Sequence, residues 1–205
     1  MNTDEKTSLQ IAVKLIESER YEEAVEFLEK HLKENPDSLE GWYNLGLALA
    51  ATEKNEEAIK AYDEALAIDN MIFEVWFNKG TVLYGLGDFE KAKECYEKAL
   101  DIDQNDAEAW NNLGNALSRM GEGKQAIEAY TTAVALKPDY AEAFYNKANA
   151  HFIEGDDERA IAYAELAVEL NPSLMEMVKQ WIQVSRDRLE SEMMREKPSP
   201  ERHEP

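Results

Sequence analysis

The hydrophobic positions of this 205-residue chain recur every 34 residues. Within residues 107–140 they follow one order: a large aromatic, two leucines with a glycine beside the first, and then a small–large–small series. These positions are Trp110, Leu113, Gly114, Leu117, Ala126, Tyr130 and Ala133, and Pro138 closes the segment. The same frame returns in residues 39–72, 73–106 and 141–174, and in a weaker form in 5–38. A period kept without insertion indicates that the chain consists of copies of one structural unit.

Each copy predicts two antiparallel helices. In the copy at 107–140 the aromatic and the two leucines lie at i, i+3 and i+7, which indicates a helix over 107–120. A second helix is predicted over 124–136, after a turn in which Gly121 and Gly123 accept a left-handed backbone at little cost. The small residues let the two helix axes approach, and the large ones fill the space beside them. One such hairpin cannot bury its own hydrophobic face, so the copies must stack.

The two ends of the chain depart from this pattern. In the first copy Ser8 stands where the others have an aromatic, as expected of a terminal unit with one solvent-facing side. After the fifth copy, a last helix over 174–191 lacks a partner, and its bulky Ile182 falls where the other copies have glycine or alanine. We therefore predict one domain over 1–191 that ends in a capping helix. The polar, proline-rich segment 192–205 is expected to be disordered.

The spacing W-x2-L-G-x2-L, followed by A-x3-Y-x2-A and a proline, resembles the tetratricopeptide repeat, a 34-residue helix–turn–helix unit. The resemblance covers nearly the whole chain and recurs in register. It implies a right-handed superhelix of helix pairs, with a concave groove that holds peptides from partner proteins. We therefore predict an all-α, right-handed superhelical solenoid of antiparallel helix pairs, made of five such repeats and the capping helix.

Asparagine occupies one slot in four successive repeats, as Asn44, Asn78, Asn112 and Asn146. The resemblance places this slot on the part of the first helix that lines the groove. An asparagine side chain can donate and accept, so it can pair with both the N–H and the C=O of a peptide unit. Neighbouring first helices should lie about 8–10 Å apart, and an extended chain advances about 3.3 Å per residue, so one asparagine would meet about every third residue of a bound peptide. The alternative is that asparagine is only a common exposed choice in this slot.

The predicted groove changes character along its length. Its early part is expected to be apolar and aromatic, its later part polar, and its rim acidic. The early residues are Tyr43, Leu47, Phe77 and Tyr84, the later ones Asn111, Asn115, Tyr145 and Asn149, and the rim residues Glu40, Glu74, Glu108 and Glu142. The glutamates would favour lysine or arginine in a ligand, unless they only complement the dipole in the first turn of each helix.

The net charge of the chain is −21, from 43 acidic and 22 basic side chains. Such a surface repels phosphate backbones, so we expect no nucleic-acid binding. It favours basic partners or serves solubility. The single cysteine, Cys95, rules out an internal disulfide and suits a reducing compartment. No apolar run is long enough to span a membrane and the N-terminus is polar, so we predict a cytoplasmic protein without membrane contact.

Residues for catalysis or metal binding form no recognisable set. The three histidines lie apart from other ligand types, and neither H-x3-H nor C-x-x-C spacing occurs. His151 replaces a core leucine and is expected to be packed and hydrogen-bonded. Residues 121–124 (GEGK) lack the first glycine and the hydroxyl residue of a phosphate-binding loop. The carboxylates lie at helix-surface spacing rather than in an apolar pocket that would separate their pKa values. We therefore predict no enzymatic activity, no cofactor and no metal site.

One subtype of the family can be tested directly. Chaperone-binding tetratricopeptide domains hold a C-terminal carboxylate with asparagines and with basic residues at fixed slots. In this chain the slots that should be basic hold glutamate together with asparagine or glutamine, in every register: Glu74 and Asn78, Glu108 and Asn112, Glu142 and Asn146, or Glu176 and Gln180. We therefore predict that the chain does not bind such chaperone tails.

These observations predict a non-enzymatic scaffold or adaptor that binds an extended segment of a partner protein in its concave groove. The partner is expected to be basic or to carry apolar anchors. Two alternatives stay open. One is a self-associating structural subunit, suggested by the apolar residues Met175, Met177, Met193 and Met194. The other is an accessory domain of an enzyme complex.

Overall fold

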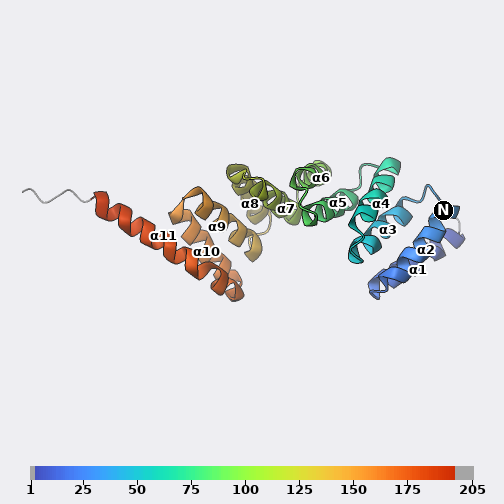
Figure 1. The fold of residues 1–205 in the computed structure, drawn as a ribbon, viewed down its shortest axis with the longest axis horizontal. Helices are drawn as coiled ribbons and strands as arrows, with labels where there is room; N and C mark the ends of the chain where they lie inside the picture. The colour runs from blue at the N-terminus through green and yellow to red at the C-terminus, as the bar shows by residue number, and fades with distance from the viewer. Residues whose placement is uncertain (1–2, 197–205) are drawn as a thin grey trace, which may run out of the picture. The chain divides into compact units, whose positions relative to one another are not determined.

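The computed structural model describes residues 3–196, and within this range all regular secondary structure is helical (Figure 1). The helices are α1 (Thr3–Glu17), α2 (Tyr21–Glu34), α3 (Leu39–Ala51), α4 (Asn55–Ile68), α5 (Phe73–Gly85), α6 (Phe89–Ile102), α7 (Ala107–Arg119), α8 (Gly123–Leu136), α9 (Ala141–Glu154), α10 (Asp157–Leu170), the short 3-10 helix η1 (Pro172–Leu174) and α11 (Met175–Glu196). Two helices fall in each predicted repeat, and α11 follows the last one. The helices α1 and α2, α3 and α4, α5 and α6, and α9 and α10 pack against each other as pairs. The prediction of an all-α chain of helix pairs is confirmed.

The chain divides into two compact units, residues 1–116 and 117–205, with the boundary inside α7. In the first unit, the first helices of successive pairs pack together, α1 on α3 and α3 on α5. The second helices α2 and α4 each pack against the first helix of the next pair. In the second unit, α8 packs on α9, α9 on α10, and α10 on α11. The predicted single domain over 1–191 stays a prediction.

Paired helices in the first unit approach closely where a glycine faces a tyrosine. A Cβ atom on Gly46 would lie 2.4 Å from the ring of Tyr62, and one on Gly80 would lie 2.9 Å from the ring of Tyr96. Both tyrosines are buried, with 0% and 2% of their surface exposed. Since real Cβ atoms do not come this close to other carbons, the pairing needs glycine at both positions.

The turn inside each of the five repeats has a residue in the left-handed backbone conformation at the same position. These residues are Glu19, Glu53, Gly87, Gly121 and Gly155, with φ angles of 57°, 60°, 83°, 80° and 79°. The residue after each one donates its N–H to the carbonyl five positions back, as in Asp88 to Leu83. This bond satisfies a carbonyl that the helix end leaves open. Gly123, which we expected in the same turn, is instead the first residue of α8.

The turns between repeats of the first unit are held by tryptophan. The indole N–H of Trp42 donates to the Pro36 carbonyl at 2.8 Å, and Trp76 does the same to Asn70 at 2.9 Å. Trp110 repeats the bond to the Gln104 carbonyl at 2.9 Å. The acceptor is a proline in one turn and a polar residue in the other two. The bond therefore fixes the turn whether or not a proline is present.

The helix α11 covers the hydrophobic end of the last helix pair, as predicted for a capping helix. Val178 and Ile182 of α11 form one buried cluster with Ala148 of α9 and Ala164 of α10. The two alanines stand in the slots that hold glycine and tyrosine in the first unit. Side chains of α11 thus pack against the two alanines.

The predicted end of the last helix is wrong by five residues. The helix continues to Glu196, so residues 192–196, predicted to be disordered, are helical. The chain has no glycine or proline between Met175 and Lys197, so nothing in this stretch interrupts the helical backbone. The rest of the predicted tail, 197–205, lies outside the described residues.

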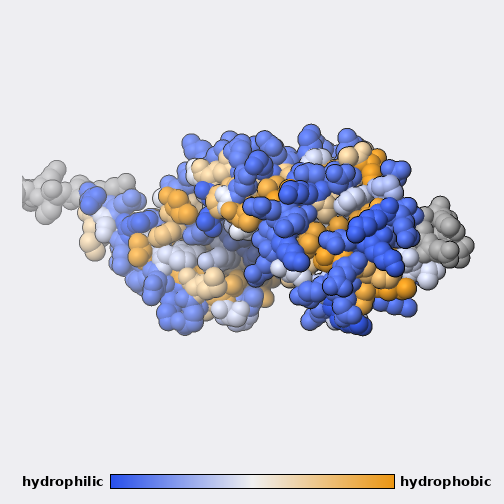
Figure 2. Space-filling model, turned by 45° about the vertical axis from the view of Figure 1, so that its right-hand side comes forward, coloured by the Kyte–Doolittle hydropathy of each residue, from blue (hydrophilic) through white to orange (hydrophobic). Residues whose placement is uncertain are grey.

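The surface displayed in Figure 2 is mostly hydrophilic, in keeping with the net charge of −21. Hydrophobic side chains reach this face in separate patches rather than as one continuous area. Isolated patches of this kind are ordinary on soluble domains. Surface hydropathy alone therefore does not point to a binding site.

We expect Gly46→Ala to lower the free energy of unfolding by about 1–3 kcal/mol, because the added Cβ overpacks against the buried Tyr62 ring. The matched control is Gly85→Ala, where a Cβ meets nothing within 4 Å. Alanine there should raise stability by up to about 1 kcal/mol. Urea denaturation measures both changes, and a similar effect of the two substitutions would contradict the close-contact argument.

Tyr62→Phe should leave stability unchanged or raise it by up to about 1 kcal/mol. The Tyr62 hydroxyl is fully enclosed, has no hydrogen-bond partner among the described residues, and burial raises its pKa. Tyr96→Phe removes a bond to Thr81 Oγ1 at 3.4 Å and should cost about 0.5–1.5 kcal/mol. Thermal unfolding of both variants provides the comparison, and a larger loss for Tyr62→Phe would refute the prediction.

Candidate functional site

Two first helices of the first unit are joined by a pair of predicted groove residues. Asn78 Nδ2 on α5 donates to the Tyr43 hydroxyl on α3 at 3.2 Å and to the Glu74 carbonyl at 2.8 Å. Both side chains are half-buried. Burial, and after it the negative charge of Glu74, raises the pKa of Tyr43. The two bonds hold Asn78 and Tyr43 in one orientation before any ligand binds.

The asparagine slot uses part of its hydrogen-bonding capacity within its own helix. Asn44 is buried, with 6% of its surface exposed, and its Nδ2 donates to the Glu40 carbonyl at 2.8 Å. Asn78 makes the equivalent bond four residues back. Asn112 is half-buried, and its Oδ1 accepts from Nδ2 of the buried Asn111 at 3.5 Å. In this slot the amide oxygen of Asn44 and of Asn78 forms no hydrogen bond among the described residues, which leaves an acceptor for a peptide N–H.

The predicted aromatic residues of the first unit are half-buried and pack on second helices. The Phe77 ring lies 5.7 Å from that of Phe73 and 5.9 Å from that of Tyr96. Tyr84 meets Phe89 of α6 edge to face at 5.3 Å. Leu47 is also half-buried. These side chains have one face in the core and expose the rest, so they are fixed in position.

The predicted residues of the second unit lie on α9. Asn146, Asn149 and Tyr145 are all half-buried. Tyr145 packs against the cluster formed with α11, so its exposure is limited by the capping helix. The four glutamates predicted at the rim are exposed, and their place at a groove rim stays a prediction; they are Glu40, Glu74, Glu108 and Glu142. Since Asn44, Asn78 and Asn112 belong to the first unit and Asn146 to the second, one continuous asparagine row stays a prediction.

A cleft of about 1120 Å³ between α4, α5 and α6 contains none of the predicted site residues. Its walls combine hydrophobic and charged side chains, namely Glu56, Ile59, Asp63, Trp76, Lys79, Leu83, Leu86, Asp88, Lys91, Glu94, Cys95, Glu97, Lys98 and Asp101. At its floor the Lys79 ammonium pairs with Asp63 at 2.5 Å and lies 5.5 Å from the Trp76 ring. Burial raises the pKa of the Cys95 thiol to about 11, so the thiol stays protonated at neutral pH.

The sequence pattern did not indicate this cleft, because none of its lining residues stands in a slot predicted to line the groove. One feature of the sequence could have indicated the cleft. Lys79 stands in a slot that holds leucine in the second and fourth repeats, and a charge in a core slot indicates a polar partner nearby. The fifth repeat also has lysine in this slot, at Lys147.

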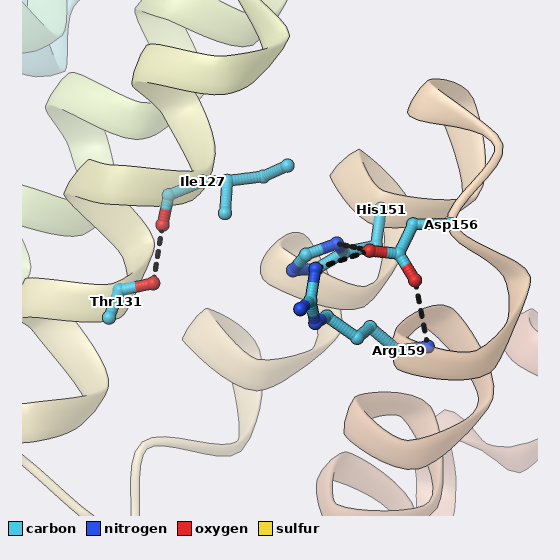
Figure 3. Close-up of polar contacts among 5 residues, drawn as sticks. All are labelled: Ile127, Thr131, His151, Asp156 and Arg159. Carbon is cyan, nitrogen blue, oxygen red and sulfur yellow. Dashed lines mark hydrogen bonds and ion pairs between the residues drawn. The ribbon is translucent and has the colours of Figure 1, made fainter.

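A second polar cluster lies at the turn between α9 and α10 (Figure 3). His151 Nδ1 lies 3.3 Å from Asp156 Oδ2, and the Arg159 guanidinium lies 2.7 Å from the same oxygen. The Arg159 backbone N–H caps the helix through Asp156 Oδ1 at 3.3 Å. The His151 ring also stacks on Tyr163, with centroids 5.4 Å apart. The prediction that His151 is a packed, hydrogen-bonded residue is confirmed.

The electrostatics of this cluster keep His151 neutral. Burial lowers the pKa of His151, and the charges of Lys147 and Arg159 lower it further against the opposing effect of Asp156. For Asp156, burial acts to raise the pKa, but the hydrogen bonds and charge of Arg159 outweigh it, so the pKa lies below the ordinary value. The cluster therefore holds one carboxylate whose charge is already shared between Arg159 and His151.

The described residues were compared with two further kinds of feature, metal-ligand clusters and membrane-spanning helices. In residues 3–196 no three histidine, cysteine, aspartate or glutamate side chains gather as they would around a metal ion. Within the same range no helix combines the length and the apolar character that crossing a membrane requires.

Family models match most of the chain. A model described as "Tetratricopeptide repeat" matches residues 9–70 and 112–174, and one described as "TPR repeat" matches residues 80–121. Together the matches include part of every predicted repeat. No curated protein matches the chain.

Solved structures resemble the fold at low sequence identity. MamA 41-end from Desulfovibrio magneticus RS-1 has a TM-score of 0.79 and 24% identity, covering 84% of this chain and 98% of that one. Another MamA crystal structure has a TM-score of 0.76 and 23% identity over 81% and 97%. YrrB, described as "a TPR protein with an unusual peptide-binding site", has a TM-score of 0.74 and 24% identity over 82% and 87%. Likeness at this identity establishes the fold.

We expect the stability of the second unit to fall as the pH drops below the ordinary histidine value of 6.5. The pKa of His151 is lower in the folded than in the unfolded chain, so the unfolded chain binds more protons in this range and gains stability from them. His151→Leu, which restores the residue type of Leu83 and Leu117, should remove this part of the pH dependence. Urea denaturation from about pH 7.5 to 5.5 measures it, and an identical profile for the variant would contradict the assignment.

Proposed function

Since the chain belongs to the tetratricopeptide repeat family, we propose that it is a protein-interaction scaffold without enzymatic activity, and that it holds an extended segment of a partner protein on its first helices. The observation that carries the proposal is the bonded pair of Asn78 and Tyr43, which joins α5 to α3 on the predicted groove face. The solved structure of YrrB, described as having a peptide-binding site, supports peptide binding on this fold.

The amide of Asn78 is prepared to accept a bond from a partner backbone. Both protons of its Nδ2 are engaged, by Tyr43 and by the Glu74 carbonyl, which aims Oδ1 away from its own helix. Because its orientation is fixed before binding, this side chain loses less conformational entropy when a ligand binds. Asn44 on α3 donates to the Glu40 carbonyl alone, and its Oδ1 also forms no hydrogen bond among the described residues. Two acceptors on adjacent helices would meet N–H groups about three residues apart in an extended segment.

Side chains around these amides would select the partner. Leu47, Phe77 and Tyr84 are half-buried and fixed by packing, so they offer apolar contact area at little entropic cost. Glu40 and Glu74 are exposed at the rim and would attract lysine or arginine, each exposed pair contributing about 0–1 kcal/mol. We therefore propose a basic segment with one or two apolar anchors.

The second unit offers the same kinds of groups on α9. Tyr145, Asn146 and Asn149 are half-buried there, and Glu142 is exposed. We propose that α9 contacts the partner too, with Asn112 and Asn115 of α7 extending the row from the first unit. Such a site would accept partner segments of different sequence, because asparagine pairs with main-chain groups that every peptide carries.

A second candidate function is self-association through α11. Met175, Met177, Met193 and Met194 expose 48%, 54%, 59% and 71% of their surface. Methionine adapts its shape to a partner surface, and four on one helix suit an interface. Light scattering at several concentrations tests this candidate. A mass that rises with concentration favours it, and a constant monomer mass rules it out.

We expect Asn78→Ala to weaken binding of the partner by about tenfold or more, because it removes one acceptor and frees Tyr43. Affinity capture from extracts of the source cells, with wild type and variant side by side, identifies the partner, and titration calorimetry then measures the change. Asn112→Ala/Asn146→Ala should weaken binding as well. Circular dichroism checks that each variant is folded.

The matched control is Glu64→Ala, an exposed position on α4 away from the predicted face. It should capture the same partner with unchanged affinity. If the asparagine variants bind as wild type does, the groove-face proposal is wrong. Loss of the partner in a variant of the α4–α6 cleft would then identify that cleft as the binding surface. Turnover of a substrate by the purified chain would contradict the non-enzymatic part of the proposal.

A further inference from the structure

Lys147 of α9 is a buried cation in a slot that holds leucine in the second and fourth repeats, and only 5% of its surface is exposed. The same slot in the third repeat holds Lys79, whose ammonium pairs with Asp63 of α4 at 2.5 Å. The residue of α8 that corresponds to Asp63 is Thr131. Its hydroxyl donates to the Ile127 carbonyl at 2.6 Å (Figure 3). Lys147 therefore lacks the acid that neutralises its counterpart.

The Lys147 ammonium forms no ion pair with any carboxylate of the described residues, and its contact is the face of an aromatic ring. Nζ lies 4.0 Å from the centroid of Tyr163. It is not sealed inside the protein, because among the described residues the Tyr62 hydroxyl is the one fully enclosed side-chain polar atom without a hydrogen bond. Part of the ammonium surface is therefore accessible to solvent.

The neighbouring charges add to the positive character of this face. Arg159 and His151 both contact Asp156, at 2.7 and 3.3 Å, so that carboxylate is already engaged. In Figure 3 the side chains of His151 and Arg159 extend toward α8, from which Ile127 extends toward them. Lys147 and Arg159 supply two positive charges against the single charge of Asp156. In a chain of net charge −21, this is a local excess of positive charge.

A buried cation without an anionic partner is unfavourable, because the charge has lost most of its hydration. Leucine in the same slot of two other repeats avoids this cost. We infer that Lys147, Tyr163, His151 and Arg159 form a site for an oxyanion, either the carboxylate of an acidic residue in a partner or a phosphate group. We call it the α8–α10 basic site. It is independent of the proposed function, which rests on the first helices and on a basic ligand.

The chemistry of the site follows from its donors. The Lys147 ammonium can donate up to three hydrogen bonds and now spends none on a carboxylate. Charge-assisted bonds of this kind are about twice as strong as neutral ones. Tyr163 holds the ammonium against its ring face. Arg159 adds a second cation, and the charges of both Lys147 and Arg159 act on His151. The slot differs from the slots of Glu142 and Asn146, where chaperone-binding members of the family carry basic residues.

The test is an NMR titration of the full chain with sodium phosphate and, separately, with sodium acetate, at constant ionic strength made up with chloride. We expect saturable shifts in the signals of Lys147, Arg159 and Tyr163, with a Kd on the order of millimolar for one or both anions. Lys147→Leu should weaken this binding by about tenfold or more. The variant should fold, because leucine is the residue of this slot in two other repeats.

The matched control is Lys79→Leu, which removes the equivalent lysine where an acid already neutralises it. It should leave the titration unchanged. A response to phosphate alone identifies a phosphate ligand, and a response to acetate alone identifies a carboxylate ligand; both support the site. The absence of saturable shifts in wild type, or the same Kd in Lys147→Leu, would overturn the proposal. No outcome of this titration changes the result expected for Asn78→Ala. The α8–α10 basic site and the proposed peptide binding can therefore be refuted separately.

Discussion

The contact between a glycine and a buried tyrosine ring determines how closely the paired helices of the second and third repeats approach. At Gly46 and Gly80 no side-chain carbon fits between the two helices, so the axes approach as closely as the rings of Tyr62 and Tyr96 allow. A single helix pair cannot bury its own hydrophobic side chains, so each pair must pack on the next. In the fifth repeat, where alanines stand in both slots, Ala148 and Ala164 pack with Val178 and Ile182 of α11.

The backbone of the first unit is held by bonds that depend on few residue types. An indole N–H closes each turn between repeats, and a residue with positive φ closes each turn within them. The remaining slots are free to vary without disturbing the pairing. This freedom explains how one slot can hold leucine in two repeats, a paired lysine at Lys79, and an unpaired buried lysine at Lys147.

The outcome is one scaffold with chemically different faces. The first helices of the first unit carry fixed amides and aromatic rings beside exposed glutamates, which suits a basic extended segment. The α8–α10 basic site offers positive charge, which suits an oxyanion. The two sites would bind ligands of opposite charge, and added salt would weaken the electrostatic part of binding at both. Fold alone decides neither function, since the family scaffold is shared by proteins with different ligands.

The sequence alone determined the helices, their pairing and the family, because a 34-residue period in hydrophobic positions has few structural solutions. It placed Ile182 against the last pair correctly, and it indicated that His151 would be packed. It also named the residues of the groove face. Their use in binding, however, stays a prediction, since slot position does not show what each side chain already bonds.

Only the tertiary structure decided which polar groups are engaged and which are not. Asn44 donates to its own helix, and Asn78 donates both to its own helix and to Tyr43 of α3. Lys79 pairs with Asp63, whereas the residue that corresponds to Asp63 for Lys147 is Thr131, which bonds within its own helix. These outcomes depend on distances between helices that lie far apart in the sequence. A repeat pattern records which residue fills each slot, but hydrogen bonds and ion pairs form between slots, and their geometry comes from packing.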